Sequence, residues 1–184
     1  MKVFDTAIPD VKIIKPTVYG DERGYFFEAY NAQKFKKLIG FCPDFCQSNE
    51  SGSIRGTIRG LHLQKAPFAQ AKLVRVVSGE VLDVAVDCRL NSSSYGKHIS
   101  IILSSDNKKQ LYIPKGFAHG FQVLSDECIL SYSVDAPYDA PSELEIDCFD
   151  NDLAIKWHTC EVIRMSEKDS RARAFSQITQ IVKS

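Results

Sequence analysis

The sequence predicts a mainly β protein whose short antiparallel strands form a sandwich or a closed barrel, and three observations support this prediction. Short apolar segments with alternating polar residues recur along most of the chain. Clusters of Gly, Asn, Asp and Ser separate these segments, as at Ser78-Gly79 and Asp106-Asn107. Helical patterns are few, and many short strands with few helices are typical of sandwiches and barrels.

The predicted strands are rich in β-branched and aromatic residues, and they cover 11–15, 24–30, 72–77, 80–87, 98–103, 109–114, 121–124 and 128–134. Two helices are predicted. The first begins after Asn31, has an apolar stripe and ends at Gly40. The second begins at Ser166, which with Asp169 resembles a capping box, and continues toward the C-terminus.

The segment 59–64 also alternates, and this places its side chains. Gly60, His62 and Gln64 share one face, and Leu61 and Leu63 share the other. If the leucines pack between two sheets, His62 faces the mouth of the barrel. The reverse register is also possible from the sequence.

Length and composition fit one domain over residues 1–184, with a strand-rich core over about 10–160 and a C-terminal helical segment over about 166–182. The 23 basic and 23 acidic residues give a net charge of zero, which argues against nucleic acid and membrane partners. No stretch resembles a signal peptide or a membrane span, so a cytoplasmic protein is expected. The six cysteines, which lack a zinc-type spacing, are expected to be reduced core residues.

Several polar residues stand in settings that suit chemistry, although each also has a structural interpretation. Gly60 leaves open space beside His62, but a lone histidine is more often structural. His119 follows Pro114 and Gly116, so it lies either at a simple turn or at an open end of the barrel. The structural and functional interpretations of His119 are about equally good.

Other candidates have stronger structural interpretations. Lys72 shares a strand face with valines and is either an edge lysine or a cavity residue. Tyr132 fits a core tyrosine, and Asp169 fits a helix-capping acid. Arg23 and Arg59 each precede a glycine, and they could be surface charges or a bidentate diphosphate clamp.

Five motifs together resemble the dTDP-4-dehydrorhamnose 3,5-epimerase family. They are GDERGYFFEAYN (20–31), IRGLHLQ (58–64), QAKLVRVVSGEVLDVAVDCR (70–89), LYIPKGFAHGFQVLS (111–125) and SEKD (166–169), in the family order. The resemblance covers about residues 5–175. It departs from the family pattern at Tyr138–Pro141, over 142–152 and at Leu63.

The resemblance implies a cupin-type jelly-roll antiparallel β-barrel with a few short helices and no cofactor. It implies an isomerase that converts dTDP-4-dehydro-6-deoxy-D-glucose to dTDP-4-dehydro-L-rhamnose, for dTDP-L-rhamnose and cell-surface polysaccharides such as lipopolysaccharide O-antigen. It further implies a homodimer in which N-terminal strands cross to the partner. The nucleotide sugar is then the only ligand expected.

The resemblance also implies roles for individual residues. His62 is the base, Asp169 orients it, Lys72 stabilises the enolate, and Tyr132 is the acid on the opposite face of the sugar. The implied substrate-binding residues are Arg23, Glu28, Gln47, Asn49, Arg59, His119, Tyr138 and Lys168.

The chemistry fits these residue types. Carbons 3 and 5 both flank the 4-ketone, so loss of either proton gives an enolate on the 4-oxygen. Histidine titrates near neutral pH and suits this abstraction, and a carboxylate on its other nitrogen fixes the tautomer. Inversion requires the proton to return from the other face, which requires a second group such as Tyr132.

Three alternative functions compete with this interpretation. A 3- or 5-mono-epimerase or a keto-isomerase of another nucleotide-linked 4-keto-6-deoxy sugar shares the base. A non-catalytic sugar-binding barrel needs no such set. A metal-dependent cupin oxygenase needs three or four protein ligands, and His62 and His119 fall short of that number, so no metal is expected.

Overall fold

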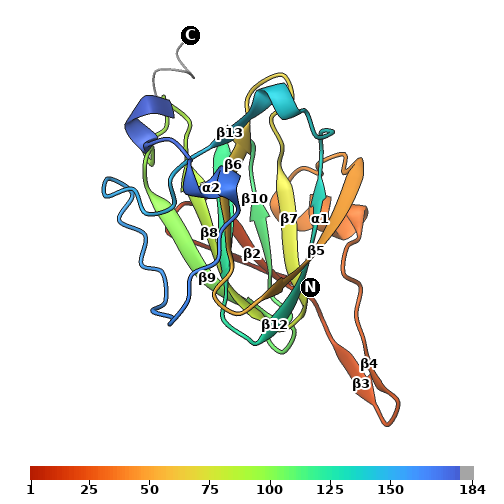
Figure 1. The fold of residues 1–184 in the computed structure, drawn as a ribbon. Coiled ribbons are helices and arrows are strands. Elements are labelled where there is room, and N and C mark those ends of the chain that lie inside the picture. Colours follow the sequence, from red (N-terminus) through yellow and green to blue (C-terminus); the bar gives the residue numbers. More distant parts are fainter. Residues whose placement is uncertain (179–184) are drawn as a thin grey trace.

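Two antiparallel sheets face each other in the computed structural model of the chain, which describes residues 1–178 (Figure 1). The six-stranded sheet runs in the order β1 (Lys2–Asp5), β2 (Lys12–Lys15), β10 (Gln110–Ile113), β7 (Lys72–Ser78), β12 (Glu127–Val134) and β5 (Gln47–Ile54). The five-stranded sheet runs in the order β13 (Glu143–Glu145), β6 (Ile58–Gln64), β11 (Phe117–Val123), β8 (Glu80–Asp87) and β9 (His98–Ser104). The predicted mainly β class is confirmed, as a jelly-roll-like sandwich.

Strand β5 is absent from the sequence prediction. Its residues, QSNESGSI, are polar and small, and such residues are poor strand formers. It forms because all eight of its residues pair with β12 at the edge of the sheet. The predicted strand 24–30 is too long, because β4 (Gly24–Phe26) ends before the chain turns toward the Asn31 helix cap.

The apolar core has three layers, and two of them lie on the two faces of the five-stranded sheet. The inner layer lies between the sheets and includes Val74, Ala85, Phe117 and Leu130. The outer layer lies under the C-terminal part of the chain. It contains Ile58, Leu61, Leu63, Leu82, Val84, Val86, Leu153, Phe175 and Ile178.

This arrangement decides which way β6 faces. The sequence left open whether Leu61 and Leu63 pack between the two sheets. They do not, because both belong to the outer layer. His62 faces the interior nonetheless, where it lies opposite His119 of β11. The C-terminal segment supplies the cover that lets both faces of this sheet be buried.

Strict alternation also fails within β6. The register with β11 shifts between His119 and Phe121, so that Arg59 pairs with Phe121 and His62 with His119. Both arginine and histidine therefore face the space between the sheets. Gly60 has φ +107° at this bulge, and a Cβ there would lie 2.6 Å from the His119 carbonyl oxygen.

The helices are short. Helix α1 (Ala32–Ile39) has the predicted caps, because Lys34 N–H donates to Asn31 Oδ1 at 3.0 Å and Gly40 adopts the left-handed conformation. It buries Phe35 against Tyr112 on the outer face of the six-stranded sheet. A single 3₁₀ turn covers Ala140–Ser142.

Helix α2 (Glu167–Ser170) begins at the predicted Ser166 cap, whose hydroxyl accepts from Asp169 N–H. The predicted helical segment is then interrupted, and residues 175–178 are helical again. Its remainder lies outside the described residues.

Strands β3 (Tyr19–Asp21) and β4 form a hairpin that projects away from both sheets (Figure 1). Tyr19, Tyr25 and Phe26 are exposed along it. Within residues 1–178, none of the helices has the length and apolarity needed to cross a bilayer.

Candidate active site

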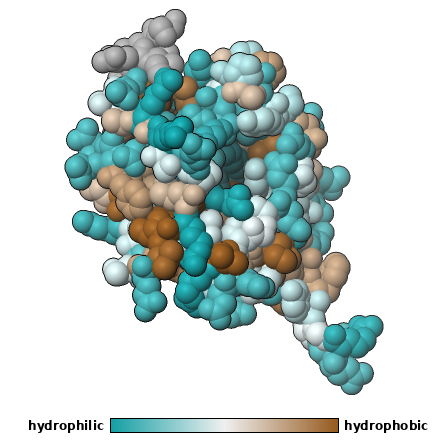
Figure 2. All heavy atoms as spheres, viewed as in Figure 1, coloured by the Kyte–Doolittle hydropathy of each residue, from teal (hydrophilic) through white to brown (hydrophobic). Residues whose placement is uncertain are grey.

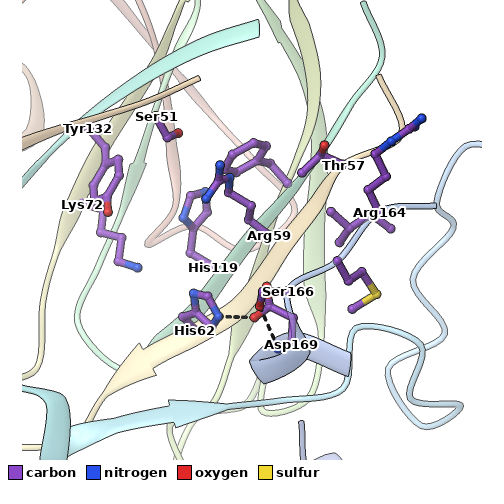
Figure 3. A pocket seen from close by; sticks show the side chains of 13 residues that line it. Ser51, Thr57, Arg59, His62, Lys72, His119, Tyr132, Arg164, Ser166 and Asp169 are labelled. Atoms are coloured by element: carbon purple, nitrogen blue, oxygen red, sulfur yellow. Dashed lines mark hydrogen bonds and ion pairs between the residues drawn. The ribbon is translucent and has the colours of Figure 1, made fainter. Parts of the chain in front are cut away.

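A cavity of about 480 Å³ opens between the two sheets, and all four predicted catalytic residues line it (Figure 3). The six-stranded sheet contributes Ser51, Lys72 and Tyr132. The five-stranded sheet contributes Arg59, His62, His119 and Phe121. Thr57, Ile58, Arg164, Met165, Ser166 and Asp169 complete the lining. The face that contains it is mainly hydrophilic and hollowed near its centre (Figure 2).

His62 and Asp169 form the shortest polar contact of the cavity. His62 Nε2 lies 2.5 Å from Asp169 Oδ1, which leaves Nδ1 free on the cavity side (Figure 3). Because the carboxylate accepts, Nε2 carries the proton and Nδ1 has the lone pair. This is the arrangement that a general base requires.

Asp169 is held as a carboxylate by its surroundings. Burial raises the pKa of this carboxyl, but the hydrogen bonds from His62, Ser166 and the Gly60 N–H outweigh burial and hold the pKa below its usual value. The Ser166 cap fixes the first turn of α2, and that turn presents Asp169 to β6. Asp169 is therefore both a residue of the capped first helical turn, as predicted, and the hydrogen-bond partner of His62.

Lys72 is buried, and Figure 3 shows its ammonium in the cavity. Burial lowers the pKa of Lys72 to about 8, and the negative charges of Asp83 and Glu143 oppose that shift. Lys72 therefore remains a cation near neutral pH without a direct ion-pair partner among the described residues. A desolvated, unpaired cation is well suited to stabilise a developing oxyanion.

Tyr132 lies beside Lys72, with the lysine Nζ 6.0 Å from its ring centroid. Burial raises the pKa of the Tyr132 phenol, the charge of Glu143 raises it further, and a hydrogen bond with Asn49 opposes the shift. The phenol thus keeps its proton at neutral pH. It enters from the six-stranded sheet, whereas His62 enters from the five-stranded sheet, so the two groups reach the cavity from opposite walls.

His119 is buried, and its Nε2 lies 2.9 Å from Asp83 Oδ2. Asp83 Oδ1 has no hydrogen-bond partner among the described residues. His119 therefore lines the cavity wall, as predicted, while a buried carboxylate fixes its ring.

The remaining predicted binding residues divide into two groups. Arg59 lines the cavity and donates to Ser53 and to the Gly52 carbonyl of β5. Four further residues lie beside the cavity: Tyr138, Lys168, Gln47 and Asn49. Gln47 accepts from Tyr138 N–H and donates to Asn49, and both Tyr138 and Lys168 bind Glu143.

Arg23 and Glu28 do not reach the cavity. Arg23 lies on the projecting hairpin, where it forms a bidentate pair with Asp21. Glu28 binds Lys34 and Asn31 at the start of α1. The structure of one chain therefore separates these two predicted substrate contacts from the other six.

Sequence reasoning missed Ser51, Arg164 and Glu143. Ser51 lies on the unpredicted strand β5, and its buried hydroxyl has no partner among the described residues. Arg164 lies two residues before the SEKD motif and joins the wall through a bridge to Thr57. Glu143 lies in the stretch that departs from the family pattern, so only its spatial position reveals it. Across residues 1–178, no three or more His, Cys, Asp or Glu side chains cluster as metal ligands.

Comparisons with known proteins agree with this geometry. The family model described as dTDP-4-dehydrorhamnose 3,5-epimerase matches residues 5–177. The dTDP-4-dehydrorhamnose 3,5-epimerase of Escherichia coli (strain K12) is 44% identical over 181 residues, which cover 98% of this chain and 98% of that protein.

Solved structures give the same result. The dTDP-6-deoxy-D-glucose-3,5-epimerase of Legionella pneumophila, solved with dTDP-4-keto-L-rhamnose, has a TM-score of 0.95 and 44% identity, covering 98% of this chain and 96% of that one. A 3'-monoepimerase of Streptomyces bikiniensis, solved with dTDP-quinovose, has a TM-score of 0.91 and 26% identity, covering 98% and 90%. The fold therefore serves both double and single epimerases.

Proposed function

The chain belongs to the dTDP-4-dehydrorhamnose 3,5-epimerase family, and from this premise we propose that His62 and Tyr132 are the base and the acid of its reaction. The protein is an isomerase that acts on a nucleotide sugar in rhamnose biosynthesis. The substrate is dTDP-4-dehydro-6-deoxy-D-glucose and the product is dTDP-4-dehydro-L-rhamnose.

The observation that carries the proposal is the placement of the two groups on opposite walls of one cavity. His62 Nδ1 takes the proton from the carbon next to the ketone, and the C–H electron pair moves to the 4-oxygen as an enolate. Tyr132 then delivers its proton to the same carbon from the other side. Both side chains then return to their first state by exchange with water, and the same sequence at the second carbon completes the double inversion.

Lys72 and Asp169 assist these steps. The Lys72 ammonium stabilises the enolate oxygen, an effect typically worth about 3–4 kcal/mol. Asp169 keeps the proton of His62 on Nε2 and stabilises the imidazolium that forms. No redox step is needed, because the carbon oxidation states at the start and the end are equal.

The diphosphate and nucleotide are bound at the mouth of the cavity in this proposal. Arg59 and His119 line the cavity, and Tyr138, Lys168, Gln47 and Asn49 lie beside it. The guanidinium of Arg59 supplies a planar fork for the diphosphate. Such remote binding energy holds the flat enolate in position.

Arg23 and Glu28 then act from a second copy of the chain in a homodimer. The hairpin that carries Arg23 projects into solvent with three exposed aromatic rings. Arg75 lies on the outer face of the six-stranded sheet, and its guanidinium has no hydrogen bond or ion pair within residues 1–178. Both features favour a partner that receives the hairpin by N-terminal strand exchange. We place this homodimer in the cytoplasm, where its nucleotide sugar is made and used for cell-surface polysaccharide.

Incubation with the 4-keto substrate in D₂O tests the function. NMR is expected to show deuterium at both C3 and C5 together with formation of the L-rhamno product. Deuterium at only one of these carbons would assign the chain to the mono-epimerases, and migration of the ketone would assign it to the keto-isomerases.

A further inference from the structure

Glu143 joins three parts of the chain at the edge of the cavity. Its Oε2 accepts from Tyr138 Oη at 2.7 Å and from Lys168 Nζ at 2.5 Å. Its Oε1 lies 3.9 Å from His62 Nδ1. The side chain is only 11% exposed, although it lies on the last strand of the five-stranded sheet. A carboxylate this buried, with two hydrogen bonds to its Oε2, has a fixed orientation.

His62 therefore faces a carboxylate at each ring nitrogen. Asp169 binds Nε2 directly, whereas Glu143 stands beyond hydrogen-bond distance from Nδ1. The nitrogen proposed to abstract the proton thus stays free for substrate, and Glu143 acts on it through charge alone. At this distance and degree of burial, the attraction between a carboxylate and an imidazolium is substantial.

The charge of Glu143 also acts on the other reacting groups. It raises the pKa of Lys72 against the larger lowering effect of burial, and after burial it is a further cause of the raised pKa of Tyr132. Glu143 itself remains ionised, because hydrogen bonds from Lys168 and Tyr138 and the charge of His62 outweigh the effect of burial and hold its pKa below the usual value. One carboxylate is thus common to the base, the acid and the enolate-stabilising cation.

We propose that Glu143 is a positioning residue of this epimerase: it holds Tyr138 and Lys168 in place, and its charge favours the imidazolium form of His62 and the ammonium form of Lys72. Both cations are needed at the same moment, when the proton has left the sugar and the enolate has formed. This inference rests on the roles proposed above for His62 and Lys72.

Other titratable and charged groups also affect the stability of these two cations. The titratable and charged side chains that face His62 or Lys72 are Glu145 of β13, Asp169 and Lys168 of α2, His119 of β11, Asp83 of β8, Tyr132 of β12 and Arg59 of β6. Of these, Glu145 makes a matched control. It lies two residues from Glu143 on the same strand, pairs with His62 across the two strands and binds the same Lys168 at 2.8 Å, but no hydrogen bond or ion pair joins its side chain to His62 within the described residues.

The test compares Glu143→Gln with Glu145→Gln. Loss of the negative charge disfavours both cations, so His62 and Lys72 each lose their proton at a lower pH. The whole pH profile of kcat for E143Q is expected to move to lower pH by about half a unit or more. We expect kcat at the optimum to fall about 3–10-fold and KM to rise as well, because Glu143 also holds Tyr138 and Lys168, which are proposed to bind the nucleotide. The E145Q profile is expected to match that of the unmodified protein.

A second measurement needs no substrate. The ring signals of His62 are assigned by NMR through their loss in a His62→Asn variant, and the pH midpoint of their titration is then compared. The midpoint is expected to fall in E143Q and to stay unchanged in E145Q. An unchanged midpoint in E143Q, or an equal fall in E145Q, would overturn the proposal. Absence of deuterium exchange in the unmodified protein would instead count against the proposed function, and the titration would still decide the role of Glu143.

Discussion

The imidazole of His62 and the carboxylate of Asp169 meet through Nε2 and Oδ1 at 2.5 Å, although 107 residues separate them in the sequence. Strand β6 supplies the histidine, and the capped first turn of α2 supplies the aspartate. The contact leaves Nδ1 free and fixes the ring, which is the geometry needed to remove a proton next to a ketone.

Replacement of Asp169 by Asn is expected to slow the reaction strongly while the fold remains. The amide offers an N–H as well as an oxygen, so it no longer enforces the protonated Nε2 and no longer stabilises the imidazolium. Deuterium exchange at both carbons should fall by about 10²–10⁴-fold. His62→Ala should abolish exchange at both carbons with unchanged circular dichroism. Full exchange in H62A would remove this residue from the mechanism.

Tyr132→Phe is expected to separate proton removal from inversion. His62 can still form the enolate, but the proton can return only from the His62 side, so the original configuration is restored. The substrate should therefore gain deuterium in D₂O while little product appears, as followed by NMR. Product formation at the normal rate would show that another group is the acid.

Lys72→Met is expected to stabilise the protein and to inactivate it. A lysine whose pKa falls from 10.5 to about 8 on folding costs the folded state on the order of 3 kcal/mol at pH 7, at about 1.4 kcal/mol per unit. Removing that cost should raise the Tm by several degrees. Deuterium exchange should fall by about 10²–10³-fold, because the enolate loses its cation.

The pH dependence of this stability gain supplies the control. Between about pH 8 and pH 10.5 the unfolded chain binds the Lys72 proton and the folded chain does not, so the native protein becomes more stable as pH rises. The advantage of K72M, measured by thermal unfolding, should thus shrink to below about 1 kcal/mol at pH 10. An advantage that stayed constant with pH would mean that packing, rather than ionisation, is responsible.

Gly60→Ala is expected to destabilise the bulge that turns Arg59 and His62 to the same side. The new Cβ would lie 2.6 Å from the His119 carbonyl oxygen and 2.7 Å from Gly120 Cα, and the backbone φ of +107° disfavours any side chain. A loss of about 2–4 kcal/mol in the free energy of unfolding should follow. Gly52→Ala is the control, because its Cβ meets nothing within 4 Å. Equal stability of the two variants in urea unfolding would contradict this account.

Mixing two inactive variants tests whether Arg23 acts from the partner. In a mixed dimer of Arg23→Ala and His62→Ala chains, one cavity has both His62 and the partner's intact hairpin. Activity should therefore return on mixing, after co-refolding, to about a quarter of the level of the unmodified dimer, from simple pairing statistics. If Arg23 acted within its own chain, no mixed cavity would be complete and the activity would stay absent.

The sequence alone determined the elements whose signals are local. Alternation and turn residues indicated most central strands, and Asn31, Gly40 and Ser166 marked helix ends as the structure has them. It failed at β5, because a strand of serine, glycine and asparagine is stabilised by its neighbour β12 and not by its own residues. The family motifs indicated His62, Lys72, Tyr132 and Asp169, and all four line one cavity.

Only the tertiary structure decided how these residues meet. The bulge at Gly60, which sets the facing of Arg59 and His62, arises from the register with β11, and the outer position of Leu61 and Leu63 arises from the C-terminal cover. The contact between Asp169 and His62, and the place of Glu143 beside them, depend on segments far apart in the chain. Periodicity reports the environment of each residue along its own strand, whereas partners across sheets are set by packing and pairing between distant segments.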